Sequence, residues 1–167
     1  PNSNFLWPGN FPETLIYQNN AVTQSLIIEN DGAGPLTISD LSLTGSTDFA
    51  WALSDYSPIL SGAQREVLVS FLPTVEGVIT GSLNIDFSGG VASESLALEG
   101  TGVYGALSAG TTSFESTFVG QQRVMDVLIS NNNNIALPIE SLSFSGAHAS
   151  SFSLAAETLS GTTLAAG

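Results

Sequence analysis

The chain has 167 residues, of which 43% are hydrophobic, so it is long enough for one large or two small domains and apolar enough to fold around a core. Fifteen acidic residues stand against two arginines and no lysine, a formal net charge of -13 that argues against nucleic-acid partners and against binding to anionic lipid. Cysteine is absent and no apolar stretch approaches the length of a membrane span, so disulfides, thiolate chemistry and direct membrane insertion are not expected.

In chain order, short segments in which every second residue is apolar follow one another through the first part of the chain. This period of two, carried by β-branched and aromatic residues, is the signature of half-buried strands. Turn signals separate the segments, and no segment sustains a helical period. The predicted fold class is therefore all-β, a sandwich or a barrel. The alternating residues are Val22, Leu26 and Ile28, then Val67, Val69 and Phe71, then Ile79, Leu83, Ile85 and Phe87, then Leu96 and Leu98.

An internal repeat divides the chain, because residues 25–45 recur as residues 126–146. Both copies shift the phase of their apolar residues at the same place, between Ile38 and Leu41 in the first copy and between Ile139 and Leu142 in the second. Such a shift predicts a β-bulge or a strand that changes sheets. The matched pairs, each separated by 101 positions, are Asn30 with Asn131, Leu36 with Leu137, Ile38 with Ile139, Leu41 with Leu142, and Gly45 with Gly146.

Three patterns in the first copy resemble the ASH family of immunoglobulin-like domains, which also recurs in bacterial choice-of-anchor surface proteins. They are a strand that ends at Asn30 before a glycine-containing turn, a Phe-x-Pro segment at Phe71 followed by Gly77, and a closing strand at residues 96–102. The resemblance covers residues 11–103 completely and residues 107–167 in part. It implies a two-sheet immunoglobulin-like fold of about seven to nine strands that serves scaffolding and protein contacts, with no enzyme and no cofactor.

The predicted organisation is a pair of tandem immunoglobulin-like β-sandwiches, of which the second is incomplete. Residues 1–10 are expected to form a lead-in or contact segment, residues 11–103 a complete sandwich, and residues 104–167 the first half of a second one. Residues 101–106 are expected to join the two sandwiches end to end as a short linker with little flexibility. The predicted core of the first sandwich is Leu26, Ile28, Ile38, Leu43, Trp51, Val69, Phe71, Leu83, Ile85 and Leu96.

The second copy lacks counterparts of the last strands of the first copy. Matching Gly62 with Gly167 leaves no equivalent of residues 65–71, 78–87 and 91–98. A sandwich without these strands would leave its inner face open and a sheet edge unpaired. Either the natural chain continues past Gly167, which we favour because it needs no special mechanism, or strands of a neighbouring chain complete the sheet. In both cases residues 107–167 are not a self-sufficient domain. Without the missing strands the apolar residues expected to be exposed are Val127, Ile129, Ile139 and Phe144.

Residues that could carry chemistry are few. His148 is the only histidine and is expected in an exposed turn, so no catalytic residue is nominated. The aspartates are scattered without an Asp-x-Asp-x-Asp spacing, which favours solvated acidic turns over a calcium site. Trp51 matches Leu154 of the repeat and is therefore expected in the core, whereas Trp7 has no counterpart and is the best candidate for a contact residue.

The function expected from these features is that of a structural repeat in an extracellular or cell-surface assembly, such as a stalk, an adhesin shaft or a filament. The alternative is an accessory module of a larger secreted protein that binds carbohydrate or protein. The expected partners are other copies or neighbouring modules of the same protein, with Trp7, Val127, Ile129 and Phe144 as candidate contacts. The lysine-free composition favours a secreted or cell-surface location in a prokaryote, with any targeting or anchoring segment outside these residues.

Overall fold

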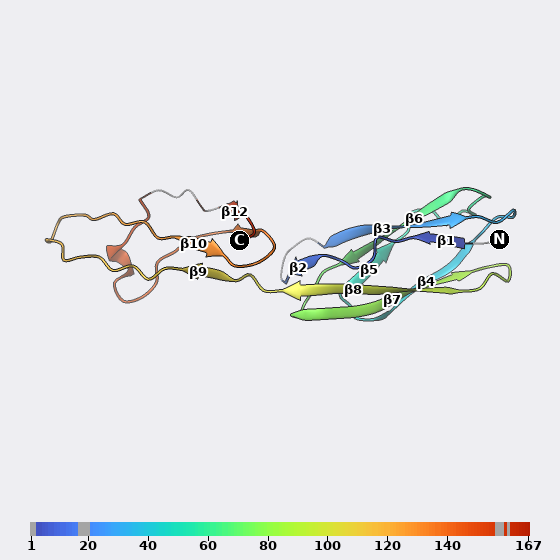
Figure 1. The fold of residues 1–167 in the computed structure, drawn as a ribbon, viewed down its shortest axis with the longest axis horizontal. Helices are drawn as coiled ribbons and strands as arrows, with labels where there is room; N and C mark the ends of the chain where they lie inside the picture. The colour runs from blue at the N-terminus through green and yellow to red at the C-terminus, as the bar shows by residue number, and fades with distance from the viewer. Residues whose placement is uncertain (1–2, 17–20, 156–158, 160) are drawn as a thin grey trace. The chain divides into compact units, whose positions relative to one another are not determined.

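The computed structural model describes residues 3–16, 21–155, 159 and 161–167 (Figure 1). The chain divides into two compact units, Pro1–Tyr104 and Gly105–Gly167. This division lies next to the boundary at residues 103 and 104 that the repeat suggests.

The first unit consists of two four-stranded sheets, ordered β1-β3-β6-β5 and β2-β8-β7-β4 (Figure 1). Neighbouring strands are antiparallel except for β2 and β8, which are parallel. The order is the A-B-E-D and C-F-G arrangement of immunoglobulin sandwiches with one strand added beside G, so the predicted fold class is confirmed. The strands are β1 (Ser3–Leu6), β2 (Glu13–Leu15), β3 (Val22–Asn30), β4 (Ile38–Gly45), β5 (Phe49–Ala52), β6 (Gln64–Phe71), β7 (Gly77–Phe87) and β8 (Glu94–Val103).

The N-terminal segment belongs to this sandwich, which corrects the expectation that residues 1–10 form a separate lead-in. Strand β1 lies antiparallel to β3, with Phe5 opposite Ile28 and Leu6 opposite Ile27. The chain then crosses to the other sheet, where the amide of Phe11 donates to the carbonyl of Glu99 at 2.8 Å. Four residues are too few to show a period of two, which is why the sequence alone did not predict β1.

Apolar side chains from both sheets fill the space between them. Seven of the ten predicted core residues are buried there, while Leu43, Trp51 and Leu96 are only partly buried against the core. At one end of the core the ring of Phe71 stacks on Phe49 at a centroid distance of 5.0 Å and lies 5.4 Å from Phe11.

The predicted phase shift in the first copy is a β-bulge in β4. The register between β4 and β7 slips between Ile38 and Asp40. Because of this extra residue, Ile38 and Leu41 are both buried although they lie three positions apart, and the prediction of a bulge is confirmed for the first unit.

The second unit has short strands that pair two by two. Strand β9 lies antiparallel to β10, and β11 lies antiparallel to β12. Asn131 of β10 lies opposite Leu107, as Asn30 of β3 lies opposite Ser3, so β9 and β10 reproduce the register of β1 and β3. The elements are β9 (Leu107–Ala109), β10 (Ile129–Asn131), β11 (Leu137–Ile139), the 3-10 helix η1 (Ala149–Ser151) and β12 (Thr162–Leu164).

Candidate interaction surfaces

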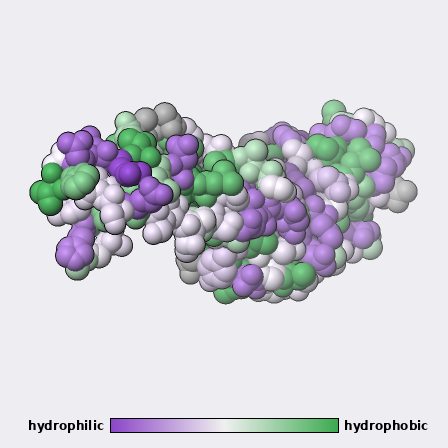
Figure 2. All heavy atoms as spheres, turned by 60° about the vertical axis from the view of Figure 1, so that its left-hand side comes forward, coloured by the Kyte–Doolittle hydropathy of each residue, from purple (hydrophilic) through white to green (hydrophobic). Residues whose placement is uncertain are grey.

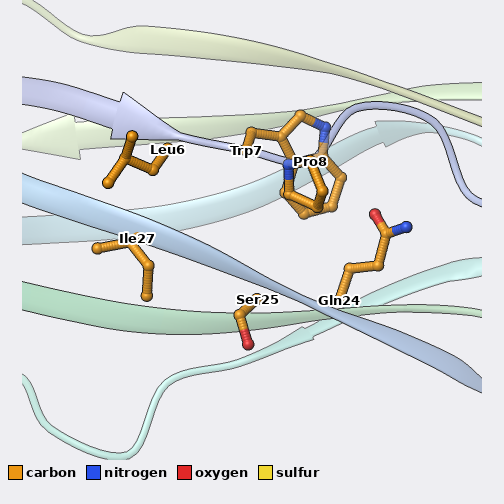
Figure 3. Close-up of a pocket in the computed structure, with 6 residues that line it drawn as sticks. All are labelled: Leu6, Trp7, Pro8, Gln24, Ser25 and Ile27. Atoms are coloured by element: carbon orange, nitrogen blue, oxygen red, sulfur yellow. The ribbon is translucent and has the colours of Figure 1, made fainter.

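The first candidate surface is an open hollow on the outer side of the first unit, with a volume of about 520 Å³ (Figure 3). Leu6 and Ile27, which are opposite one another in the register of β1 and β3, supply its apolar part. Trp7 lies at its rim, where its ring meets Phe11 edge-on at 5.7 Å. The hollow is lined by Leu6, Trp7, Pro8, Gln24, Ser25 and Ile27.

Gln24 lines this hollow, but its amide is directed toward its own unit. Its Nε2 donates to the carbonyl of Asn10 at 3.3 Å, while its Oε1 is shielded from solvent and has no hydrogen-bond partner within the described part of the chain. Because the oxygen is shielded from solvent, a ligand that lies in the hollow does not reach it without a rearrangement of the Gln24 side chain. Trp7, however, also packs on the core of its own unit, so part of its burial serves the fold.

The second candidate surface is the face of the second unit that carries Val127 and Ile129. These residues match Leu26 and Ile28 of β3 in the repeat, both of which are completely buried in the first unit. Val127 is 51% exposed and Ile129 is only partly buried. The same residue positions are therefore core in one unit and surface in the other.

Phe144 and Phe152 are two further apolar residues exposed in the second unit. Phe144 matches Leu43 and is 47% exposed, and Phe152 is 46% exposed whereas its counterpart Phe49 is buried. The rings of Phe144 and Phe152 stack at a centroid distance of 5.8 Å. Phe152 also lies 5.8 Å from Phe114, yet all three rings stay more than 40% exposed.

Ile139 departs from the expectation, because it is buried rather than exposed. It lies opposite Thr162 in the pair formed by β11 and β12, and this pair shields it. Strand β12 returns beside β11 near the end of the chain, a pairing that leaves no regular pattern in the sequence.

Few large apolar side chains of the second unit are buried. Leu137 and Ile139 are the buried ones among its described residues, and hydrophobic side chains lie at the surface among hydrophilic ones (Figure 2). Soluble proteins seldom expose so many large apolar residues on a small unit unless another surface covers them. The exposed ones are Leu107, Phe114, Phe118, Val119, Val124, Met125, Val127, Leu128, Phe144, Phe152 and Leu154.

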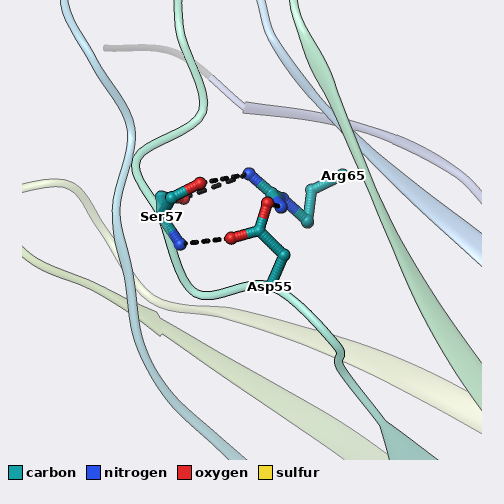
Figure 4. A network of polar contacts seen from close by, with 3 residues as sticks. All are labelled: Asp55, Ser57 and Arg65. Carbon is teal, nitrogen blue, oxygen red and sulfur yellow. Dashed lines mark hydrogen bonds and ion pairs between the residues drawn. The ribbon is translucent and has the colours of Figure 1, made fainter.

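The ion pair of Arg65 with Asp55 serves the fold of the first unit (Figure 4). Arg65 also donates to the carbonyl and the hydroxyl of Ser57, at 3.2 and 3.1 Å, and the amide of Ser57 donates to Asp55 at 2.8 Å. The Arg65 side chain is only 14% exposed. The cluster therefore fastens the loop after β5 onto β6 and leaves the guanidinium little access to a ligand.

The remaining candidates for chemistry lie apart from one another. His148 is exposed at the N-terminal end of η1. Asp48 is buried and accepts from the amide and the hydroxyl of Thr74, at 3.2 and 2.9 Å, so it holds the turn between β6 and β7. Over the described residues, no group of three His, Cys, Asp or Glu side chains is placed to hold a metal ion. Within the same residues, no helical segment has the length and apolar character needed to traverse a bilayer.

Comparison with known proteins identifies a fold but no family. No family model matches the sequence, and no curated protein matches it significantly. A protein of unknown function from Porphyromonas gingivalis W83 matches with a TM-score of 0.50 and 13% identity, over 59% of this chain and 46% of that one. The first unit is an immunoglobulin-like β-sandwich. At this identity the likeness speaks for the fold alone.

Two further solved structures are similar at lower TM-scores. The secreted serine protease VesC from Vibrio cholerae matches at 0.48, with 16% identity over 62% of this chain and 24% of that one. The seventh ASH/PapD-like domain of human CEP192 matches at 0.41, with 12% identity over 61% of this chain and 85% of that domain. The chain thus spans less than half of the Porphyromonas protein and about a quarter of VesC.

Proposed function

We propose that this chain is a structural module of an extracellular or cell-surface assembly in a prokaryote, in which ASH-like units set spacing and pack against neighbouring protein. The observation that carries the proposal is the contrast between the two units. The first closes a core between two sheets, whereas the described residues of the second include two buried large apolar side chains, Leu137 and Ile139, and eleven exposed ones. Full burial of each such side chain gains roughly 1.5–3 kcal/mol, so a protein surface that covers several of them would be bound.

The composition supports the surface location. A lysine-free chain with a net charge of -13 is kept in solution by the electrostatic repulsion between its copies. Copies associate only where the burial of apolar side chains outweighs this repulsion. Association through the apolar face of the second unit is therefore expected to strengthen as salt screens the acidic surfaces.

A matched pair of substitutions tests the contact role. Val127→Asp places a charge at a position of the second unit that is 51% exposed, and Val78→Asp places the same charge at a position of the first unit that is 65% exposed. Sedimentation velocity over a concentration series should show self-association or partner binding lost in Val127→Asp and kept in Val78→Asp. Equal behaviour of the two variants would show that the second unit is not the contact surface.

An accessory module that binds carbohydrate or protein is the second candidate, favoured by the open hollow beside Trp7. A sugar ring would pack on the indole. Titration with oligosaccharides should then change the fluorescence of the wild-type chain but not of Trp7→Phe. The sequence of the whole gene separates the two functions, because a shaft predicts further ASH-like repeats and an accessory module predicts an adjoining enzyme domain.

A further inference from the structure

The chain enters and leaves the first unit at opposite ends. Ser3 of β1 lies opposite Asn30, the last residue of β3. Gly100, near the end of β8, lies against Phe71, the last residue of β6. Because β3 and β6 are antiparallel, their last residues lie at opposite ends of the sheet. Tension along the chain therefore pulls β1 and the end of β8 in opposite directions, roughly along the strands (Figure 1).

The N-terminal part of the chain meets the last strand of the unit in a parallel pair. Residues 13–15 of β2 run beside residues 101–103 of β8, the only parallel neighbours among the described strands of this unit. One hydrogen bond extends the pair beyond each end of β2. The amide of Phe11 donates to the carbonyl of Glu99 at 2.8 Å, and the amide of Ile16 donates to the carbonyl of Val103 at 3.0 Å.

Tension along the chain acts on all hydrogen bonds of this pair together. The bonds cross from strand to strand, so moving β2 along β8 strains every one of them at once. Tension directed across the sandwich would instead break such bonds one after another from one end. Strand β1 is also pulled along its neighbour β3, because the tension enters at Ser3. The topology therefore opposes tension along the chain more strongly than tension across it.

Buried side chains hold β2 in its register. Thr14 is 2% exposed and lies between Glu13, which is exposed, and Leu15, which is partly buried. Phe11 and Ile16, on either side of β2, are buried as well. A slide by one residue would turn Thr14 outward and bring the carboxylate of Glu13 into the core, which is costly. The side chains therefore resist the same displacement as the hydrogen bonds.

We propose that the first unit transmits tension along the chain and that the pair of β2 and β8 withstands it. The inference rests on the proposed structural function and deepens it by naming what the assembly asks of the module. A module that only sets spacing needs no particular arrangement of its terminal strands. In this unit the terminal strands are parallel, are pulled in opposite directions and are fixed in register by Thr14.

Pulling on single molecules of the full chain in two directions tests the proposal. The chain has no cysteine, so introduced cysteines are unique attachment points. Ser3→Cys with Ala106→Cys applies tension along the chain. Ser3→Cys with Ser88→Cys is the matched control, because Phe5 and Phe87 lie 6.5 Å apart and place these positions at the same end of the unit on different sheets. Ala106 and Ser88 are both exposed.

At the same constant force, the first unit should unfold about tenfold or more slowly between positions 3 and 106 than between positions 3 and 88. The reason is that several hydrogen bonds must break together in the first direction. Equal unfolding rates in the two directions, or slower unfolding between positions 3 and 88, would overturn the proposal. This comparison needs no substitution in β2 or β8.

A second pair of variants tests the role of β2. Ile16→Pro removes the amide that donates to Val103, and Ile16→Val keeps it while also shortening the buried side chain. Relative to Ile16→Val, Ile16→Pro should unfold about three- to tenfold faster between positions 3 and 106 and at an unchanged rate between positions 3 and 88. Equal acceleration in both directions would show that the pair is only an ordinary part of the fold. Either failure would leave the contact role of Val127 to its own sedimentation test.

Discussion

Asn131 occupies in the second unit the place that Asn30 occupies in the first. The Nδ2 of Asn30 donates to the carbonyls of Gly34 and Ile59, both at 2.8 Å. Its Oδ1 accepts from the amide two residues further on, at 3.0 Å. One buried side chain thereby fixes the turn after β3 and the segment that returns beside it.

The contacts of Asn131 follow the same plan. Its Nδ2 donates to the carbonyl of Ile135, again four residues on, at 2.8 Å, and to those of Leu164 and Ala165 at 3.3 and 2.9 Å. Its Oδ1 accepts from the amide of Asn133 at 3.0 Å. The four consecutive asparagines therefore make the turn without a glycine because the first of them carries the hydrogen bonds.

Replacing Asn30 by alanine should lower the free energy of unfolding of the first unit by about 2–4 kcal/mol, because buried carbonyls lose their donor. Both tryptophans lie in the first unit, so urea unfolding followed by tryptophan fluorescence reports on that unit. The control Asn131→Ala should leave this transition unchanged. An equal shift in both variants would show that the two units unfold together.

Gly100→Ala should destabilise the first unit by about 1–3 kcal/mol, because a methyl group forced into a packed core displaces its neighbours. A Cβ at this position would lie 2.5 Å from the ring of Phe71. Gly34→Ala is the matched control, since a Cβ there meets no atom within 4 Å. Thermal unfolding should separate the two variants; similar midpoints would mean that the Phe71 ring can move away at little cost.

The heat of unfolding should correspond to the first unit alone. At about 0.7 kcal/mol per residue near 60 °C, residues 1–104 predict an unfolding enthalpy of about 70 kcal/mol, against about 115 kcal/mol for the whole chain. The second unit adds little because its paired strands have three residues each, and isolated two-stranded pairs are marginally stable. Scanning calorimetry of the isolated chain distinguishes the two values.

Matched substitutions in the two copies should have unequal effects. Ile28→Ala removes a completely buried side chain and should cost about 2–5 kcal/mol, whereas Ile129→Ala removes its partly exposed counterpart and should leave the main transition in place. Calorimetric midpoints of the two variants check this. A similar loss for Ile129→Ala would mean that residue 129 lies in a cooperative core.

Several structural features could be predicted because they correspond to regular patterns or constant spacings in the sequence. The repeat identifies Asn30 and Asn131 as equivalent, and the shift between Ile38 and Leu41 predicts the bulge in β4. The match of Gly62 with Gly167 agrees with the structure, since Leu36 bridges to Ile59 in the first unit and Leu137 pairs with Leu164 in the second. Each of these depends on local pattern or on constant spacing.

Features that depend on tertiary contacts were not predicted from the sequence. Ile59 and Phe11 are buried, although each lies next to a proline in a segment without alternating apolar residues. Their burial comes from strands that are distant in the sequence and pack over them. Trp51 and Leu96 follow the alternation but are only partly buried, since burial at the periphery of a sandwich depends on what the opposite sheet supplies. The hollow beside Trp7 needs β1, which is too short to be recognised in the sequence.

Amide hydrogen exchange of the isolated 167-residue chain, at a concentration where sedimentation shows a monomer, tests whether the second unit lacks a closed core. We expect slow exchange in β3, β6, β7 and β8 of the first unit and near-intrinsic exchange for residues 123–128 and 140–144 of the second, because these residues lie outside its paired strands. A monomer in which residues 123–128 are protected as strongly as their counterparts in β3 would show that the second unit has a closed core.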